Sequence, residues 1–270
     1  MDPKEASKKN IGVVLSVLLF CLSCAIILAI ASMLTKEMPP AKSNILSVGI
    51  AFGFTLLLTI PFAKWEKLKL EQIGLIPNKG SINKLFIGLL MGSILATLQT
   101  VFVLMNGHVT VYRSPQINIA SVASALALYL FVALREEVAF RAYPLRALNY
   151  AEGPFIAQTI IAIVFIIEHK IGGMTWLQAI IGPGMGALFF GTAALKTKGL
   201  ALPIGLHTAW NFVQWLLGFK PETGIYQIKV EKGFETTIDL IGWTSYVAVM
   251  AVGIFILVVW SRKTSANRAE

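Results

Sequence analysis

The sequence predicts an all-α, polytopic membrane protein with about eight transmembrane helices. Of its 270 residues, 56% are hydrophobic and 14% are charged, and the mean hydropathy is +0.72. A soluble domain usually carries about 25% charged residues, so this composition excludes an ordinary soluble protein. Long apolar stretches recur along the chain, each near the ~20 residues that cross the hydrocarbon core as a helix. We expect the whole chain, 1–270, to form a single membrane domain.

The first apolar stretch, Ile11 to Leu34, has 24 residues and no charge. A signal-peptide core is shorter and ends at a small-residue cleavage site, so we interpret this stretch as a retained anchor. Gly88 and Gly92 lie in the third stretch, where small residues allow close helix contact. The first four spans are expected at approximately 11–34, 44–63, 85–105 and 117–140.

The second half of the chain carries four more spans. Pro183 lies between Gly182 and Gly186 and is expected to kink the sixth span. The fourth helix is expected to continue beyond the membrane, so that Arg141 to Tyr150 projects into the cytoplasm. The intervening segment 64–80 mixes Lys with Leu and Ile and is expected to lie along the membrane interface. The last four spans are expected at approximately 154–170, 176–195, 200–218 and 238–260.

The distribution of positive charge predicts the orientation. With the N-terminus in the cytoplasm, 16 of the 23 Lys and Arg residues fall in cytoplasmic segments and 7 on the other side. The positive-inside rule therefore favours cytoplasmic N- and C-termini. The net charge of +9 does not indicate a nucleic-acid partner, because no basic cluster is interleaved with aromatic residues. The short N-terminal charge pattern and the absence of organelle signals indicate a prokaryotic plasma membrane.

Two adjacent glutamates, Glu136 and Glu137, follow the uncharged stretch Ile119 to Leu134. An ionised side chain at the bilayer centre costs about 2.5 kcal/mol or more, so two together indicate a functional role. Arg141 lies one helical turn after Glu137 and can neutralise it as an ion pair. Glu136 would then be the carboxylate left for chemistry.

The other polar groups within the spans are expected at a similar depth. His169 ends the fifth span, and His207 lies in the seventh with Asn211 one turn later. Counting ~1.5 Å per residue from the connecting turns brings them to the height of Glu136 if the fourth helix projects into the cytoplasm. We therefore expect one pocket, built by the fourth to seventh helices.

Two chemistries fit such a pocket. A carboxylate and an imidazole can hold and deprotonate a water, while a second imidazole and an amide can donate hydrogen bonds to an oxyanion. Glu136, His169 and His207 could instead bind Zn²⁺, with Asn211 supporting a ligand. The sequence lacks the compact H-E-x-x-H helix that would favour zinc, so a metal-dependent and a metal-independent glutamate mechanism both stay open.

Three motifs carry a family resemblance. Glu136-Glu137-Val-Ala-Phe-Arg141 resembles the EExxxR motif of the CAAX prenyl protease and bacteriocin-processing (CPBP, type II CAAX endopeptidase, Abi) family of intramembrane proteases. Phe165 to His169 resembles its FxxxH motif, and His207 to Asn211 its HxxxN motif. The motif-bearing core covers about 117–217.

The resemblance implies an all-helical membrane endopeptidase, a hydrolase. By carry-over, Glu136 would activate the water with His169, and His207 with Asn211 would stabilise the oxyanion. Glu137 and Arg141 would support the site. Glu168, beside His169, is not part of the family pattern and would either orient His169 or face water.

Two other classes of function compete with the protease. A non-catalytic membrane scaffold or bacteriocin self-immunity protein could use the same fold to bind a partner helix. A proton-coupled transporter could also use carboxylates and histidines in the membrane, but it would require inverted repeats and broken helices, and the sequence shows neither. For the protease, the few extramembrane residues favour a lipidated or membrane-associated peptide as substrate.

Overall fold

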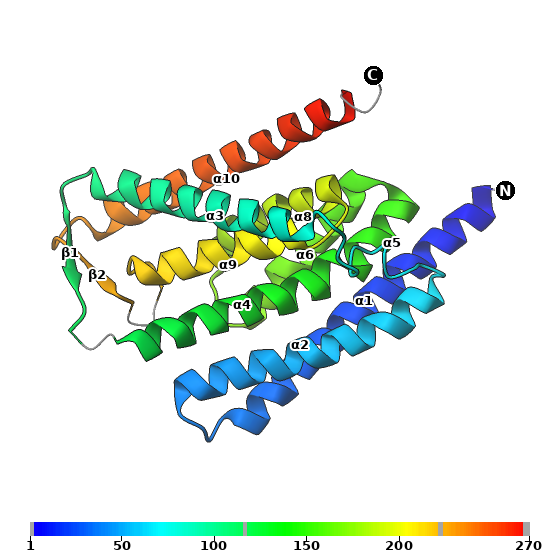
Figure 1. Ribbon diagram of the computed structural model, residues 1–270, viewed down its shortest axis with the longest axis horizontal. Coiled ribbons are helices and arrows are strands. Elements are labelled where there is room, and N and C mark those ends of the chain that lie inside the picture. The colour runs from blue at the N-terminus through cyan, green and yellow to red at the C-terminus, as the bar shows by residue number, and fades with distance from the viewer. Residues whose placement is uncertain (1–2, 116–117, 221–223, 267–270) are drawn as a thin grey trace.

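Helices make up most of the chain in the computed structural model, which describes residues 3–115, 118–220 and 224–266. The all-α membrane fold predicted from the sequence is confirmed (Figure 1). The extreme termini, 1–2 and 267–270, which were expected in the cytoplasm, lie outside the described residues. The helices are α1 (Pro3–Thr35), α2 (Pro40–Trp65), α3 (Ser81–Leu104), α4 (Ile119–Arg141), α5 (Tyr143–Glu152), α6 (Pro154–Ile171), α7 (Trp176–Ala179), α8 (Met185–Thr197), α9 (Ala201–Leu216) and α10 (Glu235–Ala266).

Seven helical stretches in the described ranges are long and apolar enough to cross a membrane. The chain is therefore an integral membrane protein. The remaining expected span, 200–218, corresponds to α9, which has 16 residues and is about 24 Å long. Most of its side chains are buried in the protein, among them Leu202, Leu206 and Trp210. Because neighbouring helices surround it, α9 is an internal helix.

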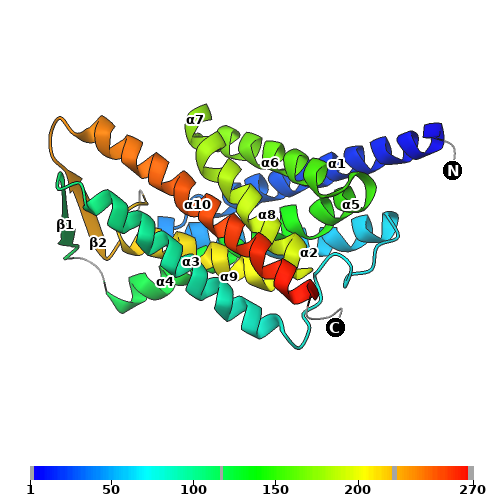
Figure 2. The same ribbon diagram turned by 90° about the horizontal axis from the view of Figure 1, so that it is seen from above.

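Helices α4 and α9 lie at the centre of the bundle. Helix α4 packs against α2 on one side and α9 on the other, and α9 packs against α3. Helix α10 crosses α3 and α8, while α6 packs on α5 and α8 (Figure 2). The helices α4, α6, α8 and α9 thus converge, and they include those that carry the three motifs.

The fourth helix ends earlier than the sequence analysis expected. Ala142 leaves the helical conformation, with ψ −105°, and Pro144 lies in the first turn of α5. Inside a continuous helix, the Pro144 ring would clash with the carbonyl group four residues earlier and could not donate a backbone hydrogen bond, whereas the first turn of a new helix tolerates proline, so α4 ends before it. Helix α5 does not project from the bundle, because Arg141 and Arg146 are both buried and α5 packs on α6. The continuous helix expected from α4 through Arg141 to Tyr150 is therefore wrong, whereas the position of this segment relative to the membrane stays a prediction.

Glycine contacts bring α3 and α9 into direct backbone contact. A Cβ atom on Gly205 would overlap the carbonyl oxygen of Leu85, and one on Gly92 would lie 2.6 Å from that of Leu206. The close helix contact predicted at Gly88 and Gly92 is therefore confirmed.

The second glycine pair, Gly182 and Gly186, does not bring two helix backbones into contact. Gly182 makes only an ordinary contact, with Trp243, and it lies in the π-helical turn η1 (Ile180–Gly184), which also contains Pro183. The irregularity expected at Pro183 is thus a π turn between α7 and α8.

A short two-stranded antiparallel sheet was not predicted from the sequence. Strand β1 (Val109–Arg113) pairs with β2 (Tyr226–Val230), with Val109 opposite Val230 and Arg113 opposite Tyr226. It lies at the end of the bundle away from the labelled termini (Figure 1). The pairing joins the segment after α3 to the segment before α10.

Candidate active site

Glu137 lies at the centre of the converging helices, in the last part of α4, and its side chain is fully buried. Its Oε1 atom lies 2.9 Å from Nδ1 of His207 on α9 and 3.5 Å from Nη1 of Arg141, one turn later on α4. A carboxylate oxygen only accepts, so His207 donates the hydrogen bond from Nδ1. Glu137 therefore joins α4 to α9 and fixes the orientation of the His207 ring.

Glu136 presents the second carboxylate toward the other nitrogen, Nε2, of the same imidazole. Its Oε2 atom lies 3.8 Å from Nε2 of His207, which is too long for a direct hydrogen bond. Its side chain is 12% exposed, whereas that of Glu137 is 0% exposed. Within the described ranges the Glu136 carboxylate makes no hydrogen bond, and it interacts electrostatically with both His207 and His169. Of the two carboxylates, Glu136 is the accessible one.

His169 lies in the last turn of α6, with Nδ1 2.9 Å from the carbonyl oxygen of Phe165. Because a carbonyl oxygen only accepts, Nδ1 carries a proton, and Nε2 of the neutral ring keeps a free lone pair. Asn211 lies on α9 one turn after His207 and is buried. The described residues provide no hydrogen bond to its side-chain amide. Nε2 of His169 is thus available to accept a hydrogen bond, and the Asn211 amide is available to donate one.

Aromatic rings cover the charged residues. The Phe190 ring of α8 stacks on His207, with ring centroids 4.5 Å apart and planes inclined by 12°. The Arg141 guanidinium lies 4.6 Å from the centroid of Phe165, whose ring also contacts His169 edge-on at 4.4 Å. These rings provide an apolar wall on the α6 and α8 sides, which limits water access and strengthens the electrostatic interactions inside.

An ion pair that the sequence analysis missed lies beside these residues. Arg135 on α4 donates a hydrogen bond from Nη1 to Oε1 of Glu168 on α6, and Arg135 is 2% exposed. Glu168 therefore neither orients His169 directly nor simply faces water, the two roles considered from the sequence. The available signal was an arginine directly before the glutamate pair, which a helix in lipid would hold only with a partner.

The described residues do not bring three metal ligands together at this site. Each histidine has its Nδ1 atom satisfied, which is the arrangement that leaves Nε2 free for a metal or a substrate. However, within residues 3–115, 118–220 and 224–266, no group of three His, Cys, Asp or Glu side chains is close enough to hold a metal ion. Glu136, His169 and His207, which the sequence left open as Zn²⁺ ligands, are therefore not gathered as a ligand set within the described residues.

Comparison with protein families gives one match. Residues 118–213 match the model described as type II CAAX prenyl endopeptidase, Rce1-like. The match confirms the family resemblance that the three motifs indicated. A search of curated proteins gives no match. The matched range includes the six residues considered above as the candidate site: Glu136, Glu137, Arg141, His169, His207 and Asn211.

Proposed function

We propose that the chain is an intramembrane endopeptidase. The premise is that residues 118–213 match the Rce1-like CAAX-protease family. Its reaction would be hydrolysis of a peptide bond in a lipidated or membrane-associated peptide. One observation carries the proposal: His207 is held at Nδ1 by Glu137, 2.9 Å away, while Nε2 faces the accessible carboxylate of Glu136. One carboxylate orients the imidazole and the other is left to act on a water.

The first step is activation of that water. Glu136 accepts a proton from it, and the free Nε2 atom of His169 accepts a hydrogen bond that aligns it. The resulting hydroxide attacks the carbonyl carbon of the scissile peptide bond. The carbonyl π electrons move onto oxygen, which becomes the oxyanion of a tetrahedral intermediate.

The second step is collapse of the intermediate. The Asn211 amide and the Nε2–H of His207 donate hydrogen bonds to the oxyanion. Because Nδ1 already donates to Glu137, His207 can donate from Nε2 only in its doubly protonated form. The C–N bond then breaks, and the leaving nitrogen takes the proton held by Glu136. This regenerates the Glu136 carboxylate, and the two peptide products leave the free enzyme.

Substrate entry follows from the position of the site. Glu137 and His207 are buried inside the helical bundle, so a peptide has to pass between helices to reach them, and a peptide anchored in the bilayer would do so laterally. The predicted orientation, with both termini in the cytoplasm of a prokaryotic cell, would place the scissile bond near the cytoplasmic leaflet. This arrangement favours lipidated or membrane-anchored peptides over freely soluble proteins.

The test uses purified protein in lipid nanodiscs with quenched fluorescent peptides. One peptide ends in a prenylated cysteine and three further residues, and a second is a membrane-anchored leader peptide. Glu136→Gln should lower kcat by about 10²- to 10⁴-fold, and His207→Ala or Asn211→Ala by about 10²- to 10³-fold. Unfolding temperatures in detergent serve as the control for folding.

Normal turnover by Glu136→Gln and His207→Ala would show the mechanism to be wrong. Absence of cleavage by the wild-type protein would instead favour the non-catalytic scaffold or immunity protein. Such a protein would tolerate Gln at position 136, because the amide preserves shape and hydrogen bonding.

A further inference from the structure

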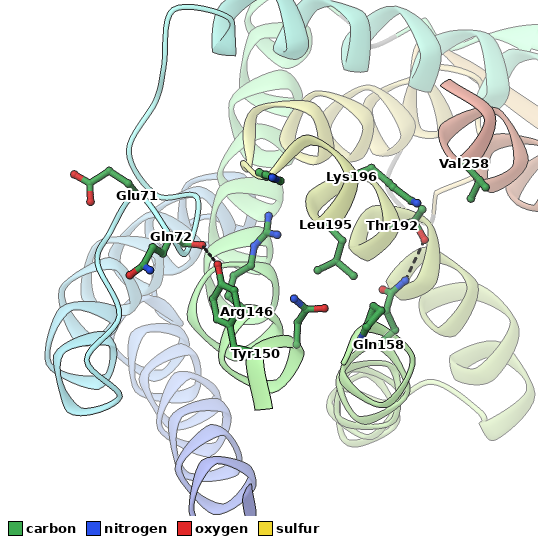
Figure 3. Close-up of a pocket in the computed structure, with 12 residues that line it drawn as sticks. Glu71, Gln72, Arg146, Tyr150, Gln158, Thr192, Leu195, Lys196 and Val258 are labelled. Atoms are coloured by element: carbon green, nitrogen blue, oxygen red, sulfur yellow. Dashed lines mark hydrogen bonds between the residues drawn. The ribbon is translucent and has the colours of Figure 1, made fainter. Parts of the chain in front are cut away.

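A polar cavity lies apart from the candidate active site. It has a volume of about 540 Å³ and lies between α5, α6 and α8, with Gln72 of the segment after α2 and Val258 of α10 completing its wall (Figure 3). Gln158, which lines it, precedes His169 by three helical turns on α6, or about 16 Å. None of the six candidate active-site residues lines this cavity.

Arg146 is the central group of the cavity. It is 4% exposed and lies on α5, and Figure 3 shows its guanidinium between Tyr150 and Leu195. It donates a hydrogen bond from Nη2 to the carbonyl oxygen of Ala194, 2.5 Å away, while its buried Nε has no partner. No carboxylate within the described residues forms an ion pair with it. A buried guanidinium that lacks an anion is costly, and a ligand with acceptor oxygens would satisfy it.

The charge balance of the lining is positive. Lys196 and Lys198, at the end of α8, join Arg146 around the cavity, against a single carboxylate, Glu71. Figure 3 shows the Glu71 side chain directed away from Arg146. The lining, as the described residues form it, therefore carries three cations and one carboxylate, so a bound anion would be attracted to it.

The other polar side chains of the wall are already held in place. Gln158 donates to Thr192 Oγ1 at 3.0 Å, and Thr192 donates to the carbonyl oxygen of Leu188 at 2.7 Å. Tyr150 donates from its hydroxyl to the carbonyl oxygen of Gln72 at 3.2 Å. These bonds link α6 to α8 and α5 to the segment after α2. The walls are therefore fixed without any ligand, which is the condition for a preformed site.

The position of the cavity indicates the source of the anion. It lies near the ends of α8 and α10, where Lys84 of α3 donates a hydrogen bond to the carbonyl oxygen of Thr197 and Tyr150 bonds Gln72 of the lysine-containing segment between α2 and α3. Basic pockets between transmembrane helices at the cytoplasmic surface recognise the head groups of anionic lipids. Pro154, Leu195 and Val258 add apolar surface to the same lining, which suits a glycerol backbone and the first acyl carbons.

We propose that this cavity binds the phosphate group of an anionic glycerophospholipid. Arg146 would donate to the phosphate oxygens from within the protein, and Lys196 and Lys198 would neutralise it from the rim. The bound lipid would lie between α5, α6 and α8 and fasten these helices together. The proposal does not depend on the protease mechanism, because binding can be measured on an inactive variant.

The test measures binding of a short-chain phosphatidylglycerol to the purified protein in detergent, by microscale thermophoresis. Phosphatidylcholine and inorganic phosphate are the comparison ligands. Binding of phosphatidylglycerol should be at least about fivefold weaker in the double variant Lys196→Gln/Lys198→Gln. The matched control is Lys64→Gln/Lys79→Gln, which removes the same charge from two exposed lysines that do not line the cavity.

Three outcomes would overturn the proposal: equal loss of binding in both double variants, no preference over phosphatidylcholine, or equally tight binding of inorganic phosphate. The last would assign the cavity to a soluble phosphate instead of a lipid. Arg146→Lys adds a second measurement, because it keeps the charge and removes the guanidinium fork. It should weaken phosphatidylglycerol binding, and an unchanged affinity would contradict the central role of Arg146.

Discussion

The ion pair between Arg135 and Glu168 joins the two helices that carry the proposed water-activating residues. Arg135 directly precedes Glu136 on α4, and Glu168 directly precedes His169 on α6. The pair therefore sets the relative position of these two helices at the level of the site. Neither member is part of the three motifs.

Loss of one member of this pair should destabilise the protein. Glu168→Ala leaves Arg135 buried without a partner, so we expect a loss of about 3 kcal/mol in the free energy of unfolding. The double variant Arg135→Met/Glu168→Leu should regain most of that loss, because no uncompensated charge remains. Denaturant titration in mixed micelles measures both. An equal loss in the single and double variants would show that the uncompensated charge of Arg135 is not the cause of the loss.

Glu137→Gln and Glu136→Gln should separate stability from activity. Gln at 137 removes the charge that neutralises the fully buried Arg141, so we expect about 3 kcal/mol of lost stability together with lower kcat. Gln at 136 should leave the unfolding transition nearly unchanged and remove turnover, because Glu136 is accessible and makes no hydrogen bond within the described residues. Thermal unfolding and turnover are measured on the same preparations. A reversed pattern would exchange the roles of the two glutamates.

The α3–α9 contact should tolerate no side chain at Gly205. Gly205→Ala places a methyl group against the carbonyl oxygen of Leu85, and we expect a loss of about 1 to 3 kcal/mol as the two helices separate. Gly53→Ala is the matched control, because a Cβ there meets nothing within 4 Å and Ala favours helix. Unfolding temperatures in detergent compare the two. Similar values would mean that α3 and α9 can move apart at little cost.

Chelation should leave hydrolysis intact. The described geometry does not arrange Glu136, His169 and His207 as a ligand set, so we expect turnover to persist after dialysis against a strong chelator. Elemental analysis of the active protein provides the independent measurement. Loss of turnover on chelation, with recovery on addition of Zn²⁺, would replace the glutamate mechanism with a metal-dependent one.

The sequence predicted the helices well because each span has to bury a long apolar surface. The close contact at Gly88 also followed directly from the small-residue spacing. The break after Arg141 was missed because Arg141, Arg146 and Asn149 suggested exposure, whereas Pro144 was the decisive signal. The β1 strand was missed because Val109 to Arg113 is short, although its run of three β-branched residues followed by Tyr112 was available.

The site could be predicted only in part, for a physical reason. Spacing along one helix relates Glu137 to Arg141, since both lie on the same face. It cannot relate Arg135 to Glu168, which meet only when α4 and α6 pack. Nor can it show which carboxylate holds Nδ1 of His207, because that depends on the rotation of α9 against α4.

The π turn η1 has a consequence for the phase of α8. A π turn accommodates one residue more than an α turn, and one residue corresponds to a rotation of about 100° around the helix axis. Phe190 stacks on His207 with that extra residue in place. Deleting one residue within Ile180–Gly184 would restore a regular helix and turn Phe190 away from the imidazole. The length of this turn, and not only its composition, is therefore part of the active-site architecture, and insertions or deletions there should be far less tolerated than substitutions.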